Sequence, residues 1–533
     1  MLAGVVSVGS VDARGAIVAG KPFKTTVQSV RLQPRRFSGV HRVSPIKHPQ
    51  VHEQGGEGGR LGHDPRARLD RKPGQQTRLR GLRARVGLPD APRANPLAVS
   101  AAATDPMQLF TVSDLGQPPA TGFPMEPQAA AAGDVVFYSG NSAGAFSLDG
   151  GATFTFVQPD VMFGAVDGGF CCDTMVRFAP SVNRFLWLIQ YWCAPNPGCP
   201  GTSGNSNRYR LAVASPEAIR ANASNPAAAW VVYDLTTGLY NGLMKKAFKD
   251  GPSWFDKPDM AVGRRHAYLT WDVVGRGTIN IRINLADLAA GRTANSLAFA
   301  GTDIFWRTAQ NPGTTGIWIK NGHTDSSAVV YTLADASNVI VEHRVSHTAL
   351  PTDDYSSLTS LGEDWTTRAS SSAPGSATVR GGELWIAWNA ARNYKLGKRT
   401  VAVLPQPHIQ IAVYNRSTFK LIRELDYWNG GVAILNPALA TNSQRDVAIS
   451  FSYGGPNNPP GPGVGFLTGH LEGAIAATAD PVSGQGQGDY ASVQPDFPDT
   501  TRFVSGGYVS RNNGGVITNR WVFTRFGRAS PGP

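Results

Sequence analysis

Residues 143–155 read AGAFSLDGGATFT, and this stretch decides the fold class. The side chains of Ser147 and Asp149 can bond backbone N–H groups across a tight turn, and the two glycines that follow accept positive φ. Phe154 comes next, where a hairpin would direct an aromatic ring inward between strands. The stretch therefore predicts a β-hairpin whose turn is stabilised by its own side chains.

Short runs of β-branched and aromatic residues, separated by Gly, Asn, Asp and Pro, continue from about residue 130 to the end of the chain. Most alternate with a period of two, which is typical of half-buried antiparallel strands, and helix-period segments are nearly absent. The clearest runs are VVFYSG (135–140), RFLWLIQYW (184–192), HAYLTWDV (266–273), ELWIAWNA (383–390), HIQIAVYN (408–415) and RWVFTRFG (520–527). The pattern predicts an all-β body.

The number of such runs is too large for one sandwich. Radial repetition of four-stranded antiparallel sheets is the economical alternative, because it leaves only short, protected edges. At roughly 60–70 residues for each sheet, residues 106–530 are predicted to form a six-bladed β-propeller, with seven blades as the alternative. The strong run at 520–527 is expected to pair with the first strand, near Met107, and so to close the ring.

The first hundred residues differ from the rest in charge and composition. They hold 18 of the 50 Lys and Arg but only 6 of the 38 Asp and Glu, which leaves 32 of each for the remaining chain. They also contain none of the 12 Trp and 14 Tyr. We therefore predict a disordered basic extension over residues 1–105. Two origins stay open: sequence that is not genuinely coding, and the remnant of an export signal that ends at 97–103 (LAVSAAA).

The four cysteines lie at 171, 172, 193 and 199. Cys193 and Cys199 bracket a loop of the right size for a local disulfide in an oxidising compartment. Cys171 and Cys172 are adjacent and are expected either to form a vicinal disulfide or to stay as buried thiols. The spacing fits no zinc site, so no metal is expected.

The motif at 147–154 fits Ser-x-Asp-x-Gly-x-Thr-aromatic and resembles the Asp-box (BNR repeat) of sialidase-like β-propellers, a group of exported bacterial proteins. Three further stretches carry the resemblance over most of 107–528: GFCCDTMVRFAPSVNRFLWLIQYW (169–192), FDKPDMAVGRRHAYLTWD (255–272) and GQGDYASVQPDFPDTTRF (486–503). The resemblance implies that the box lies on the outer rim, away from substrate. It also implies three arginines for a carboxylate, an Asp acid/base and a Tyr activated by a Glu. The segment GFPMEP (122–127) departs from the family because it lacks the expected Arg.

Candidate catalytic residues are carboxylates, a histidine and a phenol near turns or strand starts, where they can do acid/base work. They are Asp173, Asp256, His323, Asp325, Asp489 and Tyr490. Candidate substrate-binding residues are four arginines for an acidic group and two tryptophans for stacking on a sugar. They are Arg307, Arg344, Arg368, Arg392, Trp254 and Trp365. Each has a structural alternative, as a turn residue or a packed core residue. In contrast, Trp385 and Trp388 face opposite sides of one strand and are expected in the core.

These features predict an exported, sialidase-like glycoside hydrolase that acts on complex or acidic glycans by carboxylate acid/base catalysis. Two alternatives are a non-catalytic glycan- or protein-binding propeller and a lyase of uronate polymers with Tyr490 or His323 as base. We expect a carbohydrate partner, a monomer, no cofactor, no nucleic acid and no membrane span, and a secreted, periplasmic or cell-surface location. If the protein is an enzyme, Asp173, His323, Arg368 and Asp489 should meet in one pocket at a mouth of the propeller.

Overall fold

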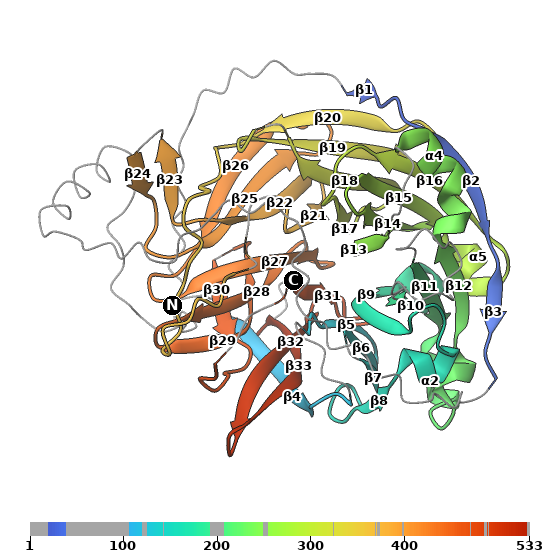
Figure 1. The fold of residues 1–533 in the computed structure, drawn as a ribbon, viewed down its shortest axis with the longest axis horizontal. Coiled ribbons are helices and arrows are strands. Elements are labelled where there is room, and N and C mark those ends of the chain that lie inside the picture. Colours follow the sequence, from blue (N-terminus) through green and yellow to red (C-terminus); the bar gives the residue numbers. More distant parts are fainter. Residues whose placement is uncertain are drawn as a thin grey trace, which may run out of the picture.

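The structure is a computed structural model. It describes residues 20–38, 106–119, 125–141, 143–191, 207–248, 254–322, 324–367, 369, 374–396, 399–469, 471–483, 488 and 490–529. Most of these residues lie in antiparallel sheets that radiate from a common centre (Figure 1).

The strands described fall into groups of four, and one nine-stranded sheet joins two such groups with an added strand. The first three groups are β5 (Gln128–Ala132), β6 (Val135–Gly140), β7 (Ala143–Ser147), β8 (Thr155–Val157); β9 (Phe170–Ala179), β10 (Arg184–Tyr191), β11 (Arg208–Ala214), β12 (Val231–Thr236); and β13 (Phe255–Val262), β14 (His266–Val273), β15 (Gly277–Asn284), β16 (Ala294–Gly301). The next two are β17 (Arg307–Gln310), β18 (Thr315–Asn321), β19 (Ser327–Ala334), β20 (Val341–Ser346); and β21 (Ser376–Arg380), β22 (Glu383–Ala390), β25 (His408–Asn415), β26 (Leu421–Tyr427). The last two are β27 (Ala433–Thr441), β28 (Val447–Gly455), β29 (Asn458–Phe466), β30 (Glu472–Ile475); and β31 (Ser492–Pro495), β32 (Phe503–Asn513), β33 (Val516–Arg528), β4 (Met107–Gly116).

The first strands of these groups surround the centre. In the order β5, β9, β13, β17, β21, β27 and β31, each contacts the next, and β31 contacts β5 (Figure 1). β17 and β21 pair in parallel, with Ala309 opposite Ala377, and this pair joins two groups into the nine-stranded sheet. Four-stranded antiparallel sheets arranged around a centre are the architecture of a β-propeller.

The last sheet is shared between the two ends of the body. β31, β32 and β33 come from the end of the chain, and β4 pairs antiparallel with β33, with Met107 opposite Arg528. This is the pairing of first and last strands that the strong run at 520–527 predicted.

Apolar clusters fill the spaces between neighbouring sheets. One joins Phe137 of β6 to Trp187 of β10, whose ring centroids lie 4.8 Å apart. Trp385 and Trp388 of β22 are fully buried in two different clusters, one on each face of their sheet, as their spacing predicted. Middle strands such as β6, β10 and β22 therefore bury both faces, which explains why they read as long apolar runs.

The remaining regular elements are short. They are the hairpin β23 (Asn393–Leu396) and β24 (Arg399–Ala402), the helices α2 (Pro159–Phe163), α3 (Pro216–Ala221), α4 (Asn241–Ala247) and α5 (Leu285–Ala290), and the 3-10 turns Pro180–Val182, Pro226–Ala229 and Thr237–Tyr240. Within the residues that the structure describes, no helix is long and apolar enough to span a membrane.

Residues 20–38 form an N-terminal strap along the outer edges of three sheets (Figure 1). In it β1 (Lys21–Pro22) pairs with β20, β2 (Val27–Leu32) with β16, and β3 (Pro34–Arg36) with β12. Val30 and Leu32 are 7% and 0% exposed and join the apolar cluster between two sheets. The prediction of disorder over residues 1–105 is therefore wrong for this segment, because two apolar positions spaced by two bury one face of a strand. Residues 1–19 and 39–105 lie outside the described residues.

The turn between β7 and β8 has the bonding that its sequence predicted. The Ser147 hydroxyl donates to Asp149 at 2.6 Å and accepts from the Gly151 N–H at 2.8 Å. The Asp149 carboxylate accepts from the N–H and the hydroxyl of Thr153 at 2.9 and 2.5 Å. These hydrogen bonds, from Ser147 and then Thr153, hold the pKa of Asp149 far below its usual range. The turn joins the two strands of its sheet that lie farthest from the centre, so it is a structural element of the rim.

Candidate functional site

Three inner strands are irregular near their starts, and these irregularities build the site. In β9, Thr174 lies opposite Ile189 while Phe170 lies opposite Tyr191, so residues 171–173 face a single residue of β10. A bulge of this kind breaks the alternation of a strand and redirects side chains. Accordingly, Cys171, Cys172 and Asp173 are all partly exposed, whereas the six residues that follow them in β9 are buried.

β13 and β27 carry similar bulges. In β13 the register shifts between Asp256 and Asp259, and Lys257 adopts a φ of 50°. In β27 it shifts between Leu435 and Ala438, and Asn436 adopts a φ of 55°. Proline follows each of these positive-φ residues. Because proline has no N–H, it cannot donate a hydrogen bond to a regular β-ladder.

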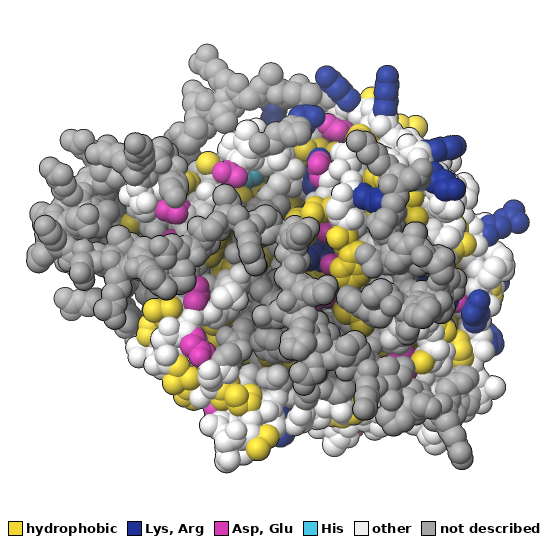
Figure 2. Space-filling model, viewed as in Figure 1, with side chains coloured by type: hydrophobic (Ala, Val, Ile, Leu, Met, Phe, Trp, Pro, Cys, Tyr) yellow, Lys and Arg dark blue, Asp and Glu magenta, His cyan; other side chains and the backbone are white. Residues whose placement is uncertain are grey.

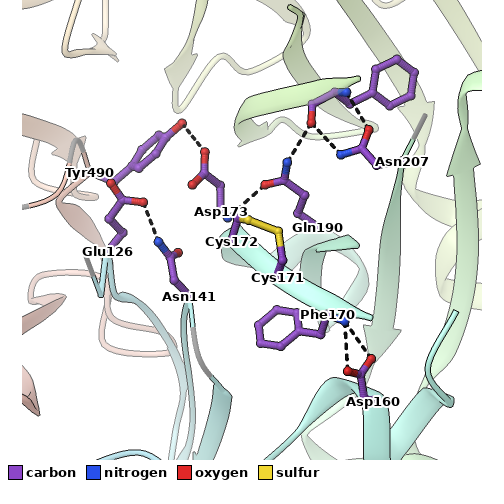
Figure 3. The surroundings of a disulfide bond; sticks show 11 residues. Glu126, Asn141, Asp160, Phe170, Cys171, Cys172, Asp173, Gln190, Asn207 and Tyr490 are labelled. Carbon is purple, nitrogen blue, oxygen red and sulfur yellow. Dashed lines mark hydrogen bonds between the residues drawn. A yellow bond between two sulfur atoms is a disulfide. The ribbon is translucent and has the colours of Figure 1, made fainter. Parts of the chain in front are cut away.

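Cys171 and Cys172 form a disulfide directly before Asp173. Cys172 has a φ of 23°, at the edge of the left-handed region. The Asp173 N–H donates to the side-chain oxygen of Gln190 at 3.0 Å, and the Gln190 amide donates to the Phe255 carbonyl at 2.7 Å. The bulge, the disulfide and Gln190 together fix the backbone that carries Asp173 (Figure 3).

Asp173 faces Tyr490, which precedes β31. The Tyr490 hydroxyl donates to Asp173 Oδ2 at 3.2 Å, and Figure 3 shows the two side chains pointing toward one another. The guanidinium carbon of Arg307 lies 5.1 Å from the centre of the Tyr490 ring, within the range of a cation–π contact. Beside Tyr490, Glu126 accepts a hydrogen bond from Asn141 at 2.8 Å.

Two further carboxylates belong to this group. Asp256 of β13 lies opposite Asp272 of β14 in the ladder. The Asp272 carboxylate accepts from the Phe305 N–H at 2.8 Å. Next to Asp256, the Lys257 ammonium sits 4.4 Å from the centre of the Phe305 ring. We call Asp173, Asp256, Asp272, Arg307 and Tyr490 the central site.

The electrostatics of the central site raise the pKa values of three of its groups, Asp256, Asp272 and Tyr490. Burial, reinforced by the charge of Asp173 and opposed by Lys257, raises the pKa of Asp256 to about 7. Burial likewise raises the pKa of Asp272 to about 7, although the hydrogen bond from the Phe305 N–H and the charge of Arg307 act to lower it. Burial and then Asp173 hold the pKa of Tyr490 well above its usual value, with Arg307 opposing them. Near neutral pH, Asp256 can therefore hold a proton, which suits a general acid.

Below the central site, the space between inner strands is small. A cavity of about 20 Å³ is lined by Arg307 and Tyr490 at the site and by Arg177 and Asp259 farther in. The Asp259 carboxylate accepts from the N–H groups of Met260 and Thr308, each at 2.8 Å. This volume accommodates no more than a water or two, so this cavity does not hold a sugar.

Sequence reasoning and structure agree on part of this group. Of the residues it proposed, Asp173, Asp256, Tyr490 and Arg307 come together, and Trp254 lies just before β13. His323, Arg368 and Asp489 lie outside the described residues, as do Cys193 and Cys199. The meeting of Asp173, His323, Arg368 and Asp489 in one pocket therefore stays a prediction.

Four other proposed residues have structural partners elsewhere. Arg344 of β20 pairs with Glu342 at 3.1 Å, and Arg392 pairs with Asp354 at 2.5 Å. Trp365 is 2% exposed and packs against the start of β27, so its ring cannot stack on a sugar. Asp325 lies in the turn between β18 and β19, where its backbone carbonyl accepts a hydrogen bond from the Leu350 N–H at 2.8 Å. Local ion pairs and packing, which spacing alone cannot reveal, explain these differences.

The sequence reasoning missed several residues of the group, namely Asp272, Glu126, Gln190 and Lys257. Asp272 carried a usable signal, because it is a carboxylate in the otherwise apolar run HAYLTWDV. Pro258 and Pro437 inside strand-like runs were signals for the bulges. Across the described ranges, no group of three or more His, Cys, Asp or Glu has a geometry that could hold a metal ion.

Comparisons with known proteins give little beyond this geometry. No family model and no curated protein matches the chain. Among solved structures, an α-L-arabinofuranosidase from Fusarium graminearum is 10% identical over 78% of this chain and 98% of its own, with a TM-score of 0.36. An α-L-arabinanase from Penicillium chrysogenum has the same identity, coverage and TM-score. A protein of unknown function from Dyadobacter fermentans is 11% identical over 79% of this chain and 99% of its own, with a TM-score of 0.38.

Proposed function

We propose that the protein is a glycoside hydrolase that works through the central site. The observation that carries the proposal is the pairing of Asp256, whose pKa is raised to about 7 by burial and by Asp173, with the partly exposed Asp173 beside it. Glycoside hydrolysis uses a general acid of raised pKa together with a second carboxyl group.

In this mechanism Asp256 is the general acid that protonates the leaving oxygen. Asp173 is the carboxylate partner, and the Tyr490 hydroxyl orients it through the hydrogen bond at 3.2 Å. Tyr490 itself is a poor nucleophile, because burial and Asp173 disfavour its phenolate. Arg307, above the Tyr490 ring, limits the accumulation of negative charge.

The substrate that fits this electrostatic environment is neutral. An anionic sugar would add negative charge to a group that already holds four carboxyl side chains, Asp173, Asp256, Asp272 and Glu126, which are close enough to perturb one another or Tyr490. Arg307 is the one predicted arginine that contributes at the described central site, whereas a sialic acid carboxylate needs several. We therefore propose a neutral glycan in place of the acidic glycans that the sequence predicted and of the uronate polymers of the lyase alternative.

The proposal extends to architecture and location. The four-stranded groups described above number seven, and we propose that they are the blades of a seven-bladed propeller. We also propose that the protein is exported, which the Cys171–Cys172 disulfide supports because disulfides persist in oxidising compartments.

The test is a screen of neutral oligo- and polysaccharides for release of reducing ends. Asp173→Asn and Asp256→Asn should each lower kcat by roughly 10²- to 10⁴-fold. Asp287→Asn is the matched control, since the Asp287 carboxylate of the rim helix α5 accepts hydrogen bonds from Arg292 and Asn295 and does not belong to the central site. Activity of the wild type should fall as the pH rises above about 7, where Asp256 loses its proton.

Other outcomes would replace the proposal. Glycan binding without release of reducing ends from any substrate would indicate a binding propeller. An unsaturated product that absorbs in the ultraviolet would indicate a lyase. Retention of full activity by both variants would exclude the central site.

A further inference from the structure

The outward side of the N-terminal strap is strongly basic. Residues 20–38 contain five cationic side chains and no acidic one, and all five are exposed. They are Lys21, Lys24, Arg31, Arg35 and Arg36. In β2 the alternation is direct: Val30 and Leu32 face the core, while Arg31 between them faces solvent. The strap therefore attaches to the sheets by one side and presents positive charge on the other.

Helix α4 extends the same surface. The strap residue Gln28 accepts a hydrogen bond from the Leu243 N–H at 2.9 Å and donates to the Leu239 carbonyl at 3.0 Å. These two hydrogen bonds hold α4 beside β2. Lys245 and Lys246 of α4 are exposed. Figure 2 shows Lys and Arg side chains projecting along the edge of the molecule where Figure 1 places β1, β2, β3 and α4.

Most of this charge is not neutralised locally. Lys21 lies opposite Glu342 in the β1–β20 ladder, and Arg35 pairs with Asp234 at 3.1 Å. Lys24, Arg31 and Arg36 form no ion pair with another residue in the part of the chain that the structure describes. Because residues 101–533 carry equal numbers of acidic and basic side chains, the strap departs locally from a body without net charge.

We propose that the strap and α4 form a docking surface for a flexible, negatively charged polysaccharide, separate from the central site. Extended strand covers about 3.3 Å per residue, so the cations between Lys21 and Arg36 are spread over roughly 50 Å. They follow the curved outer edge of three sheets (Figure 1). A flexible polyanion can follow this convex course and contact successive cations, releasing counterions at each.

The shape argues against other anionic partners. A planar bilayer touches a convex edge over a short arc, and duplex DNA, with a persistence length of about 50 nm, does not bend around it at low cost. Single-stranded nucleic acid binds through stacked aromatic rings, but the two aromatic residues of the strap are already packed. Phe23 lies against Tyr331 at 4.6 Å and Phe37 against Phe163 at 5.4 Å, measured between ring centroids.

The experiment measures binding of the full chain to polygalacturonate, with dextran, phosphatidylglycerol vesicles and single-stranded DNA as comparison ligands. The variant carries Lys24→Gln, Arg31→Gln and Arg36→Gln. The matched control carries Arg264→Gln, Arg265→Gln and Lys420→Gln, which remove the same charge from exposed turns elsewhere.

We expect the wild type to bind polygalacturonate with an affinity that falls steeply with salt. The strap variant should bind at least tenfold more weakly, and its slope of log affinity against log salt should drop by about two to three. The control should change affinity less than threefold, and Asp173→Asn should bind like the wild type, which separates this proposal from the proposed catalysis. Equal weakening by strap and control variants, unchanged binding by the strap variant, or preference for vesicles or DNA would each overturn it.

Discussion

The protonation of Asp256 makes stability depend on pH in a way that can be measured without a substrate. Burial, assisted by Asp173, raises the pKa of Asp256 from its ordinary 3.8 to about 7 in the folded protein. Well below pH 3.8, Asp256 is protonated in both the folded and the unfolded chain, so it does not make the free energy of unfolding depend on pH. As the pH rises from about 4 to 7, the unfolded chain ionises while the folded chain resists, so the free energy of unfolding falls.

The size of the effect follows from the two pKa values. Each pH unit between them is worth about 1.4 kcal/mol, so the loss above pH 7 reaches about 4 kcal/mol at most. The body from Met107 to Arg528 has an unfolding entropy of roughly 0.9 kcal/mol/K at the usual value per residue. Replacing Asp256 with Asn, which does not ionise, should therefore raise the melting temperature at pH 8 by about 4 °C.

The assay compares melting temperatures of wild type, Asp256→Asn and Asp287→Asn between pH 4 and pH 8.5. The advantage of Asp256→Asn over the wild type should grow by about 4 °C across this range. The pKa of Asp287 shifts in the opposite direction from that of Asp256. Burial alone would raise the pKa of Asp287, but hydrogen bonds from Asn295 and Arg292 outweigh burial and lower it. Asp287→Asn should therefore fall below the wild type at neutral pH and approach it as the pH falls. Parallel curves for wild type and Asp256→Asn would show that Asp256 does not titrate near 7.

Three further substitutions test other parts of the structure. Leu32→Ala leaves a cavity under the strap and should cost about 2–5 kcal/mol in urea unfolding; a change below about 0.5 kcal/mol would mean that the strap does not dock. The double change Cys171→Ser and Cys172→Ser frees the backbone before the catalytic carboxylate and should lower kcat about tenfold with KM nearly unchanged, and unaltered kcat would remove the disulfide from the positioning of Asp173. Asp149→Ala removes the turn bonds at the rim and should cost about 1 kcal/mol of stability with full activity, whereas a large loss of activity would place that turn near the substrate.

The strands were predictable because each follows one simple rule. The runs 266–273, 383–390 and 408–415 coincide with β14, β22 and β25 as apolar runs bounded by turns, although all three are buried on both faces and not half-buried as their alternation predicted. The closure of the ring was predictable for a related reason. A strong strand at the end of the body needs a partner, and β4 provides it.

The strap was not predictable from composition. Its Arg and Pro content resembles that of the surrounding extension, and only the pair Val30 and Leu32 marks it as a strand. Its partners, β12, β16 and β20, lie about 200 to 320 residues away in sequence and give no local signal.

The central site was predictable in its residue types but not in its membership. Asp173, Asp256, Arg307 and Tyr490 were recognised as chemically suitable, and the bulges in β9 and β13 direct the two aspartates to one place. Arg344 and Arg392 were equally suitable, but nearby acids bind them. Which polar side chain meets a partner is decided by tertiary packing, and spacing along the chain does not contain that information.

The strap also sets an order of events during synthesis. It leaves the ribosome first, but β12, β16 and β20 are made in that order and the last of them ends at Ser346. At about 5–20 residues per second, the segment waits roughly 15 to 65 s for its final partner. The partners of β3, β2 and β1 become available in that order, which is opposite to the direction of translation. Until each strap strand attaches, the sheet edge that it covers stands open to other chains, so a nascent chain stays prone to aggregate until β1 pairs with β20.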